Sequence, residues 1–181
     1  SVNTIADGTA VKTPGSNIFP YIKKNLDDII TVEDDELIVA FLDMVENHKM
    51  IVENSGLLTV AALKHLGVKD KRVVSILSGG NMDVITMSSV VQQGLIFRDR
   101  IFTVSVLLPD KPGELAKVAQ TLADVQGNVI KLEHNQFVTT NRSAAVELRI
   151  TLECFGTEHK EQIIAALEKK GYKPRIVRTM I

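Results

Sequence analysis

"AAVELRITLE", residues 144–153, is the stretch that decides the fold of the second half of this 181-residue chain. Apolar and polar residues alternate along it with a period of two, which is the pattern of a half-buried β-strand. Its apolar side chains face a core, and its polar side chains face away. The inward set is Ala144, Val146, Leu148, Ile150 and Leu152, and the outward set is Glu147, Arg149, Thr151 and Glu153.

The segments on both sides of this strand complete a domain over residues 97–181. A strand precedes Pro112, which fits the first turn of a helix that ends at Gly127. The inner stripe of that helix is Leu115, Val118, Ala119, Leu122 and Val125. The remaining predicted elements are strand 128–137, hairpin loop 138–143, helix 157–170 and edge strand 173–178. The order β-α-β-β-α-β predicts a ferredoxin-like α+β domain.

Residues 1–96 have a different pattern of apolar and polar residues. They contain predicted helices, and the one over 33–50 has an inner stripe of Leu37, Phe41, Met44, Val45 and His48. Strands are predicted only at 27–32 ("DDIITV") and 72–77 ("RVVSIL"), and the second is of the kind that is buried on both faces of a parallel sheet. Two strands are too few for this length, so we expect the tail of a larger α/β domain. The aperiodic stretch 86–100 is predicted to be a linker.

Composition excludes several classes of protein. The net charge of −1 argues against a broad nucleic-acid surface, and no basic block points to a membrane surface. The single cysteine, Cys154, cannot form an internal disulfide, and the four histidines make no zinc pattern. We therefore expect a soluble protein of the cytoplasm, without metal, nucleic acid or membrane partners.

The loop "SGGN", residues 78–81, follows the predicted strand 72–77. A strand followed by a small-residue turn can present backbone N–H groups to a ligand, but it can also be a plain turn. A Walker loop is excluded because no Gly-Lys-Ser/Thr follows, and a dinucleotide fingerprint is excluded because the third glycine is absent.

The companions of this loop make its pattern specific. "TIADGTAV", "DDIITV", "ENSG" and "SILSGGN" occur in this order over about 80 residues. Together they resemble the C-terminal end of the catalytic domain of threonine ammonia-lyases (threonine dehydratases) and relatives such as serine racemase, which are fold-type II enzymes using pyridoxal phosphate (PLP). "DKPGELAKVAQTLADVQGNVI", residues 110–130, is similar to ACT domains, which are small-molecule regulatory modules. The resemblance implies a catalytic-domain tail over 1–96 and an ACT domain over 97–181.

The resemblance assigns roles to four residues of the first half. Ser78 would hydrogen-bond the pyridine nitrogen of PLP, and Gly79 and Gly80 would let the backbone approach the ring. Glu53 would lie near the ring. The structural alternatives are that Ser78 caps the following helix and that Glu53 only begins one. Asp7 is predicted to hold a turn with Gly8.

The lysine that binds PLP covalently lies, in this family, in an upstream Ser-Phe-Lys-like motif that is absent here. The chain is therefore predicted to be a C-terminal fragment of a threonine ammonia-lyase, inactive alone and without covalent PLP. Two alternatives stay open at this point. One is a free-standing ACT-type amino-acid sensor or oligomerisation module, and the other is a relative that prefers serine.

In ACT domains an amino-acid effector binds where the first loop and helix of one copy meet another copy. The resemblance implies that Asp110, Lys111, Gly113, Glu114, Leu115, Asn128 and Ile130 bind the effector. A helix N-terminus there would receive its carboxylate. Isoleucine is the expected inhibitor of a biosynthetic enzyme, with valine opposing it. The alternative is that "DKPG" is only a turn, with the domain serving assembly. Exposed sheet edges predict a homo-oligomer, at least a dimer.

Overall fold

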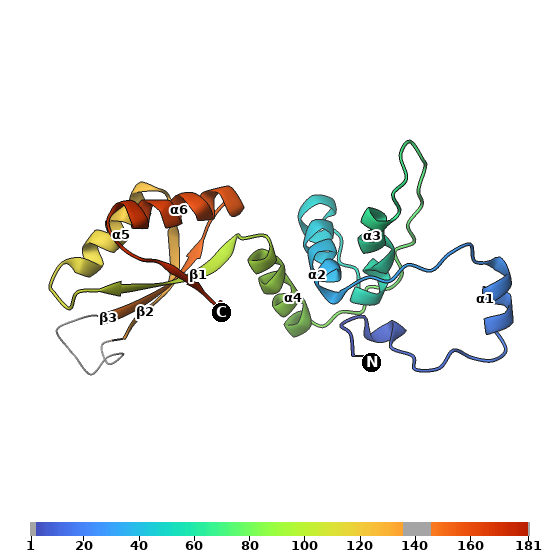
Figure 1. Ribbon diagram of the computed structural model, residues 1–181. Helices are drawn as coiled ribbons and strands as arrows, with labels where there is room; N and C mark the ends of the chain where they lie inside the picture. The colour runs from blue at the N-terminus through green and yellow to red at the C-terminus, as the bar shows by residue number, and fades with distance from the viewer. Residues whose placement is uncertain (1–2, 136–145, 181) are drawn as a thin grey trace. The chain divides into compact units, whose positions relative to one another are not determined.

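The computed structural model describes residues 3–135 and 146–180. The chain divides into two compact units, Ser1–Gly94 (unit 1) and Leu95–Ile181 (unit 2) (Figure 1). Unit 1 is helical in its described residues, whereas unit 2 contains a sheet with helices on it. No helix among the described residues is long and apolar enough to cross a membrane.

Unit 1 is organised around the helix α2. A capping box between Glu33 and Glu36 begins this helix, and its acidic first turn suits the positive end of the helix dipole. The predicted inner residues Leu37 and Phe41 are buried, but His48 is exposed because the helix widens to π geometry in its last turn. The helical elements are η1 (Asp7–Thr9), α1 (Phe19–Asn25), α2 (Asp34–Asp43), η2 (Met44–His48), η3 (Asn54–Leu57), α3 (Leu58–Ala61), η4 (Ala62–His65) and α4 (Val84–Phe97).

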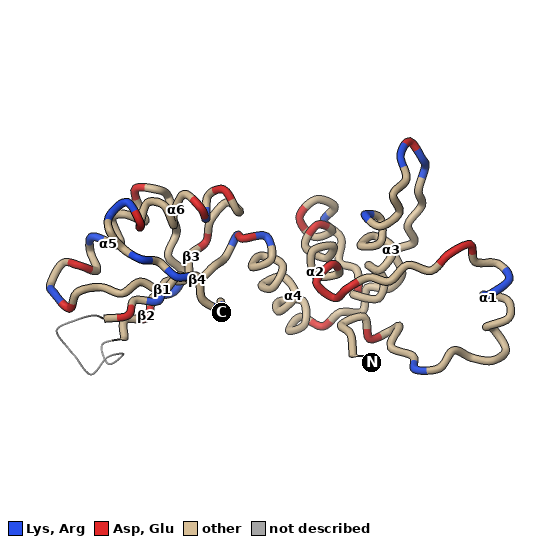
Figure 2. The backbone as a smooth tube through the Cα atoms, viewed as in Figure 1, with Lys and Arg blue, Asp and Glu red and all other residues tan. Residues whose placement is uncertain are grey.

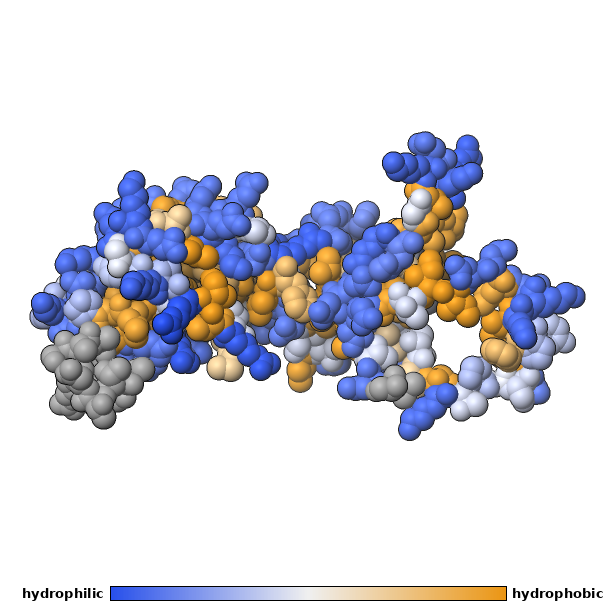
Figure 3. All heavy atoms as spheres, viewed as in Figure 1, coloured by the Kyte–Doolittle hydropathy of each residue, from blue (hydrophilic) through white to orange (hydrophobic). Residues whose placement is uncertain are grey.

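The strands predicted at 27–32 and 72–77 are wrong for this chain, because no residue described in unit 1 lies in a strand. Val74 is 89% exposed and Ile76 is 73% exposed. Figures 2 and 3 show this segment projecting from the unit, with a charged tip above an apolar stem. A β-branched run becomes a strand only when a neighbouring strand accepts its hydrogen bonds, and the described part of unit 1 offers none.

The stretch 86–100, predicted to be an aperiodic linker, is mostly the helix α4, and the boundary between the two units falls within it. The side chain of Asp83 accepts hydrogen bonds from the N–H groups of Ile85 and Thr86, which caps the helix. Val90 is buried, and Gly94 lies against the side chain of Leu42. Val90 and Gly94 are the only buried residues of α4, all of which is described, and Val84 and Ile85 are exposed, so no continuous apolar stripe marks this helix in the sequence.

Unit 2 has the predicted ferredoxin-like fold. Its strands are β1 (Ile101–Leu108), β2 (Asn128–Asn135), β3 (Val146–Glu153) and β4 (Arg175–Val177), and its helices are α5 (Glu114–Asp124) and α6 (Thr157–Lys169). The strand order is β2-β3-β1-β4, and every pairing is antiparallel. Both helices lie on one face of the sheet (Figure 1). The hairpin loop predicted at 138–143, with Ala144 of the quoted strand, lies outside the described residues.

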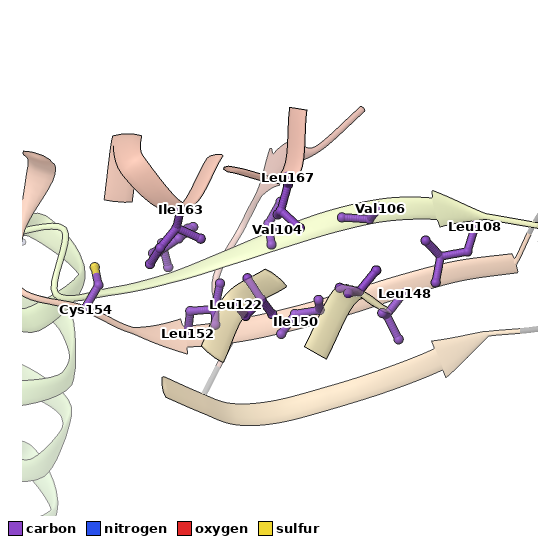
Figure 4. Packing of buried hydrophobic residues seen from close by; sticks show 12 residues of the cluster. Val104, Val106, Leu108, Leu122, Leu148, Ile150, Leu152, Cys154, Ile163 and Leu167 are labelled. Atoms are coloured by element: carbon purple, nitrogen blue, oxygen red, sulfur yellow. The ribbon is translucent and has the colours of Figure 1, made fainter. Parts of the chain in front are cut away.

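The core of unit 2 lies between the sheet and its two helices (Figure 4). It contains inward residues of β1, β3, α5 and α6, together with Cys154, which follows β3: Phe102, Val104, Val106, Leu108, Val118, Leu122, Leu148, Ile150, Leu152, Cys154, Ile163 and Leu167. Leu115 and Ala119 were predicted to be inward but are exposed. The helix α5 starts at Glu114, after the left-handed Gly113 (φ +91°), so Pro112 lies before the first turn.

Candidate functional site

Three loops of unit 1 meet at the segment "ENSG", residues 53–56. Each residue of this segment contacts one of the other two motifs, "IADG" at 5–8 or "SGG" at 78–80. The sequence placed these motifs far apart, and the structure brings them together. The predicted cofactor residues Ser78, Gly79 and Glu53 therefore belong to one cluster.

Two of these contacts are with the glycine loop. A side chain on Gly79 would overlap the carboxylate of Glu53, and a side chain on Gly56 would overlap the carbonyl oxygen of Ser78. Gly79 also has φ +75°, a conformation that favours glycine. The N–H of Glu53 donates to the carbonyl of Gly79 at 3.4 Å. The loops are packed so closely that glycine is required at both positions.

The other two contacts are with the first motif. The side-chain amide of Asn54 is buried and donates to the carbonyl of Ile5 at 3.0 Å. A side chain on Gly8 would come within 2.8 Å of the hydroxyl of Ser55. Asp7 accepts a hydrogen bond from the N–H of Gly8 at 2.8 Å, which is the turn predicted from the sequence. Sequence reasoning assigned no role to Asn54, although its side chain connects two of the loops.

Ser78 does not cap the helix that follows, so that structural alternative is wrong. The helix α4 begins six residues later, and Asp83 caps it. Hydrogen bonds from the hydroxyl and the N–H of Thr86 hold the pKa of Asp83 below its usual value. Ser78 itself is exposed, and its hydroxyl forms no hydrogen bond within the described residues. A hydroxyl in this state is available to a ligand.

A cleft of about 440 Å³ lies beside the three-loop cluster. Glu53, Asn54 and Asp7 line it from the loops, and Asn81, Asp83 and Gln93 line it from the segment that leads into α4 and from α4 itself. Three carboxylates and no basic side chain face it. Ser78 and the two glycines lie outside the cleft lining. Gly80 approaches the carbonyl oxygen of Ile51, which a side chain at Gly80 would meet at 3.6 Å.

The structure separates the predicted effector residues into two groups. Asp110, Lys111, Gly113, Glu114 and Leu115 follow β1, whereas Asn128 and Ile130 begin β2. Strands β1 and β2 are both antiparallel to β3, and Asn128 and Ile101 both pair with Glu153. The two groups are therefore at opposite ends of the sheet. The eight-residue length of the strands separates them by about 25 Å.

Several of these side chains already have partners. The ammonium of Lys117 contacts Glu114 at 2.7 Å, and this hydrogen bond raises the pKa of Lys117. The amide of Asn128 donates to Glu153 at 3.0 Å. Leu115 and Ile130 are 40% and 43% exposed, so their apolar surface is free to meet a ligand or another chain. One chain alone does not assemble the predicted effector site.

Comparison with known families identifies the two units. Residues 1–79 match the family model of pyridoxal-phosphate dependent enzymes, and residues 102–171 match that of the ACT domain. The chain therefore joins a segment similar to pyridoxal-phosphate dependent enzymes to a segment similar to ACT domains. The fold class predicted from the sequence is thereby confirmed.

Similar proteins match across both units. An L-threonine ammonia-lyase from Geobacter sulfurreducens is 38% identical over 93% of this chain and 42% of its own length. A biosynthetic L-threonine dehydratase from Pasteurella multocida is 31% identical over 94% of this chain and 33% of its own. The crystal structure of a serine racemase from Dictyostelium discoideum is 43% identical over 45% of this chain and 28% of its own, with a TM-score of 0.40. The chain spans less than half the length of these curated relatives.

Proposed function

We propose that this chain is the C-terminal part of a PLP-dependent L-threonine ammonia-lyase, which converts threonine to 2-oxobutanoate and ammonia. The observation that carries this proposal is the 38% identity to an L-threonine ammonia-lyase over 93% of the chain, through both the enzyme segment and the ACT domain. In this proposal unit 1 contributes one wall of the cofactor site, and unit 2 regulates the enzyme.

The three-loop cluster fits the cofactor assigned to it. The glycines at 79 and 80 keep side chains away from the loop surface, and the exposed hydroxyl of Ser78 is free to meet the pyridine nitrogen. Bound PLP would supply an electron sink for breaking bonds next to the amino group. A hydroxyl partner leaves the ring nitrogen largely neutral, whereas a carboxylate would keep it protonated, so Ser78 favours β-elimination over transamination. Glu53 is held beside this loop by its contact with Gly79.

The proposal predicts where activity resides. The present chain alone should not bind PLP covalently or release ammonia from threonine. We would search the genomic sequence in frame with Ser1 for a Ser-Phe-Lys-like motif and express that longer chain. It should convert threonine, and Ser78→Ala should reduce kcat/KM at least about tenfold, since one lost hydrogen bond costs about 1.4 kcal/mol. Ser88→Ala, which removes the hydroxyl of an exposed serine in α4 outside the three loops, is the matched control.

The same assay separates the alternatives. Faster conversion of serine than of threonine would identify a serine-preferring relative. A start codon at position 1, with no catalytic segment before it, would favour a free-standing sensor. The proposal expects the lysine that binds PLP to lie outside the present chain. It would be contradicted if the present chain showed the absorbance band of lysine-bound PLP and Ser78→Ala lost that band.

We also infer that unit 2 binds an amino-acid effector between two copies of the chain. The separation of its predicted residues to opposite ends of the sheet supports a site made by two chains. In the edge strand β2, Val129, Ile130 and Leu132 are 38%, 43% and 42% exposed to solvent. This apolar surface is available for a contact between two chains.

Calorimetry with the present chain tests the effector. Isoleucine should bind, valine should compete with it, and threonine and serine should bind weakly. Ligand at 100 times its Kd should also stabilise the fold by about 2.7 kcal/mol. Binding that persists in a monomeric chain, or that is unchanged by Asn128→Ala, would contradict a site shared by two copies. If a folded dimer bound none of these amino acids, unit 2 would serve to assemble the subunits and would not bind an effector.

A further inference from the structure

Among the described residues of unit 2, no helix covers the second face of the sheet (Figure 1). Residues alternate along β1, so Thr103 and Ser105 point away from the core that contains Val104. Cross-strand pairing places Lys131, Thr151, Thr103 and Val177 in one row on this outer face. The row borders a hollow of about 150 Å³, lined by Thr103, Lys131, Glu133, Arg149, Thr151, Val177, Arg178 and Met180.

The hollow is positively charged. Lys131, Arg149 and Arg178 line it together with a single acid, Glu133, so its lining carries a net charge of +2. Figure 2 shows basic positions in blue along the strands of this unit and beside the C-terminus. On one side of the hollow the next row of the sheet adds Arg175, with Glu147 beyond it, and on the other side Glu153 lies next to Thr151 on the same face. These neighbours reduce the net charge of the region to +1 but do not cancel it.

The cations keep donor groups available. Lys131 contacts Glu133 at 2.9 Å, and Arg149 contacts Glu147 through Nε at 3.1 Å, which leaves its terminal nitrogens. No ion pair joins Arg178 to another residue in the described part of the chain. An arginine fork matches the oxygens of a phosphate or carboxylate with two parallel hydrogen bonds.

The floor of the hollow is polar as well. The hydroxyls of Thr103 and Thr151 are hydrogen-bonded to each other at 2.9 Å, and these residues are only 6% and 4% exposed. Two hydroxyls that share one hydrogen bond retain one proton for another acceptor. Because a buried hydroxyl donor without a partner is unfavourable, a ligand oxygen that accepts its hydrogen bond stabilises the complex.

We propose that this hollow binds a small dianionic oxyanion of the phosphate type, as the free ion or as a phosphate ester. The charge of a phosphate group, about −1.5 to −2 near pH 7, balances the net charge of the lining. The volume of about 150 Å³ is about ten times the roughly 10–15 Å³ of cavity that holds one water molecule, so a five-atom ion fits. None of the residues that line the hollow belongs to the three loops of unit 1 or to the predicted effector residues, and the proposal does not depend on the proposed lyase function.

The test is a titration of the full chain with inorganic phosphate at constant ionic strength and pH 7.5, followed by amide NMR. Saturable shifts are expected at Thr103, Arg149 and Thr151. Acetate, a monoanion, should bind at least about tenfold more weakly, because it offers fewer oxygens and less charge to the cations of the hollow. Glycerol phosphate separates the two sources: tighter binding than inorganic phosphate would identify an ester, and weaker binding would identify the free ion.

Arg178→Ala should weaken phosphate binding at least about tenfold. The matched control is Arg175→Ala, which removes the same charge from the next row and should change Kd less than twofold. Lys131→Gln provides a second variant at the opposite side of the hollow. Absence of saturable shifts, equal effects of Arg178→Ala and Arg175→Ala, or acetate binding as tight as phosphate would overturn the proposal.

Discussion

Unit 1 and unit 2 differ in how many large hydrophobic side chains they leave exposed to solvent. Among the described residues, 17 large hydrophobic side chains are exposed in unit 1 and nine in unit 2. In unit 2 all four strands are paired, and the helices cover the apolar face of the sheet. In unit 1 the segment 67–78 donates no backbone hydrogen bond to another described carbonyl.

This difference shows which sequence patterns are sufficient to form paired structure without partners from distant segments. An alternating strand with antiparallel neighbours a few residues away in sequence finds its partners within unit 2. A β-branched run such as 72–77 needs parallel neighbours, which come from distant segments. The apolar stem of this segment is available for such neighbours, as the proposed longer enzyme would supply.

The largest expected contrast between the units is in hydrogen exchange. Amides in the paired core of β1 and β3 should exchange at least about 1,000-fold more slowly than those of residues 72–77, a difference of about 4 kcal/mol in opening free energy. Mass spectrometry of deuterated peptides from the full chain measures this. Equal protection of the two regions would show that 72–77 is paired in solution, for instance in an oligomer.

Truncation of a core side chain should destabilise unit 2 next most strongly. Leu148 is fully buried in β3, so Leu148→Ala should lower the free energy of unfolding by about 2–5 kcal/mol. Leu107→Ala is the matched control, because Leu107 is 49% exposed in β1 and should cost about 0.5 kcal/mol. Urea denaturation followed by circular dichroism compares them, and similar losses would argue against the core described.

Gly56→Ala tests the three-loop cluster of unit 1. Its new methyl group would overlap the backbone carbonyl of Ser78, which cannot move without shifting the loop. We expect a loss of about 1–3 kcal/mol in unit 1 and none in unit 2. Gly15→Ala, where the nearest neighbour of the new methyl is 4.0 Å away, should be close to neutral. Equal melting curves for the two variants would show that the loops are not packed together.

The smallest expected effect is an acid-dependent one at Glu36. A hydrogen bond from Lys64, with those from the Glu33 backbone and His65, lowers the pKa of Glu36 to about 2. A lowered folded-state pKa stabilises the fold above the ordinary value of 4.5, and this contribution is lost as the pH falls toward about 2. Carbon NMR of the Glu36 carboxyl measures the pKa, and Lys64→Met should raise it.

Glu36→Gln should flatten the pH dependence of stability in that range for unit 1. The acid response of unit 2 should stay, because hydrogen bonds from Ser105 and Arg149 lower the pKa of Glu147 there. A titration midpoint of Glu36 near 4.5 would contradict the ion pair.

The sequence by itself determined the fold of unit 2, because alternation with a period of two, the helix stripes and the turn residues are local signals that agree with one another. It also supplied the motifs of the three loops. Only the tertiary structure decided that Asn54 connects two of those loops, that Asp83 rather than Ser78 caps α4, and that 86–97 is helical. It also decided that the run 72–77 stays unpaired in the described chain. The connection through Asn54 joins residues distant in sequence, and such contacts leave no periodic pattern along the chain. The cap at Asp83 is local, but it can be recognised only once the start of α4 is known.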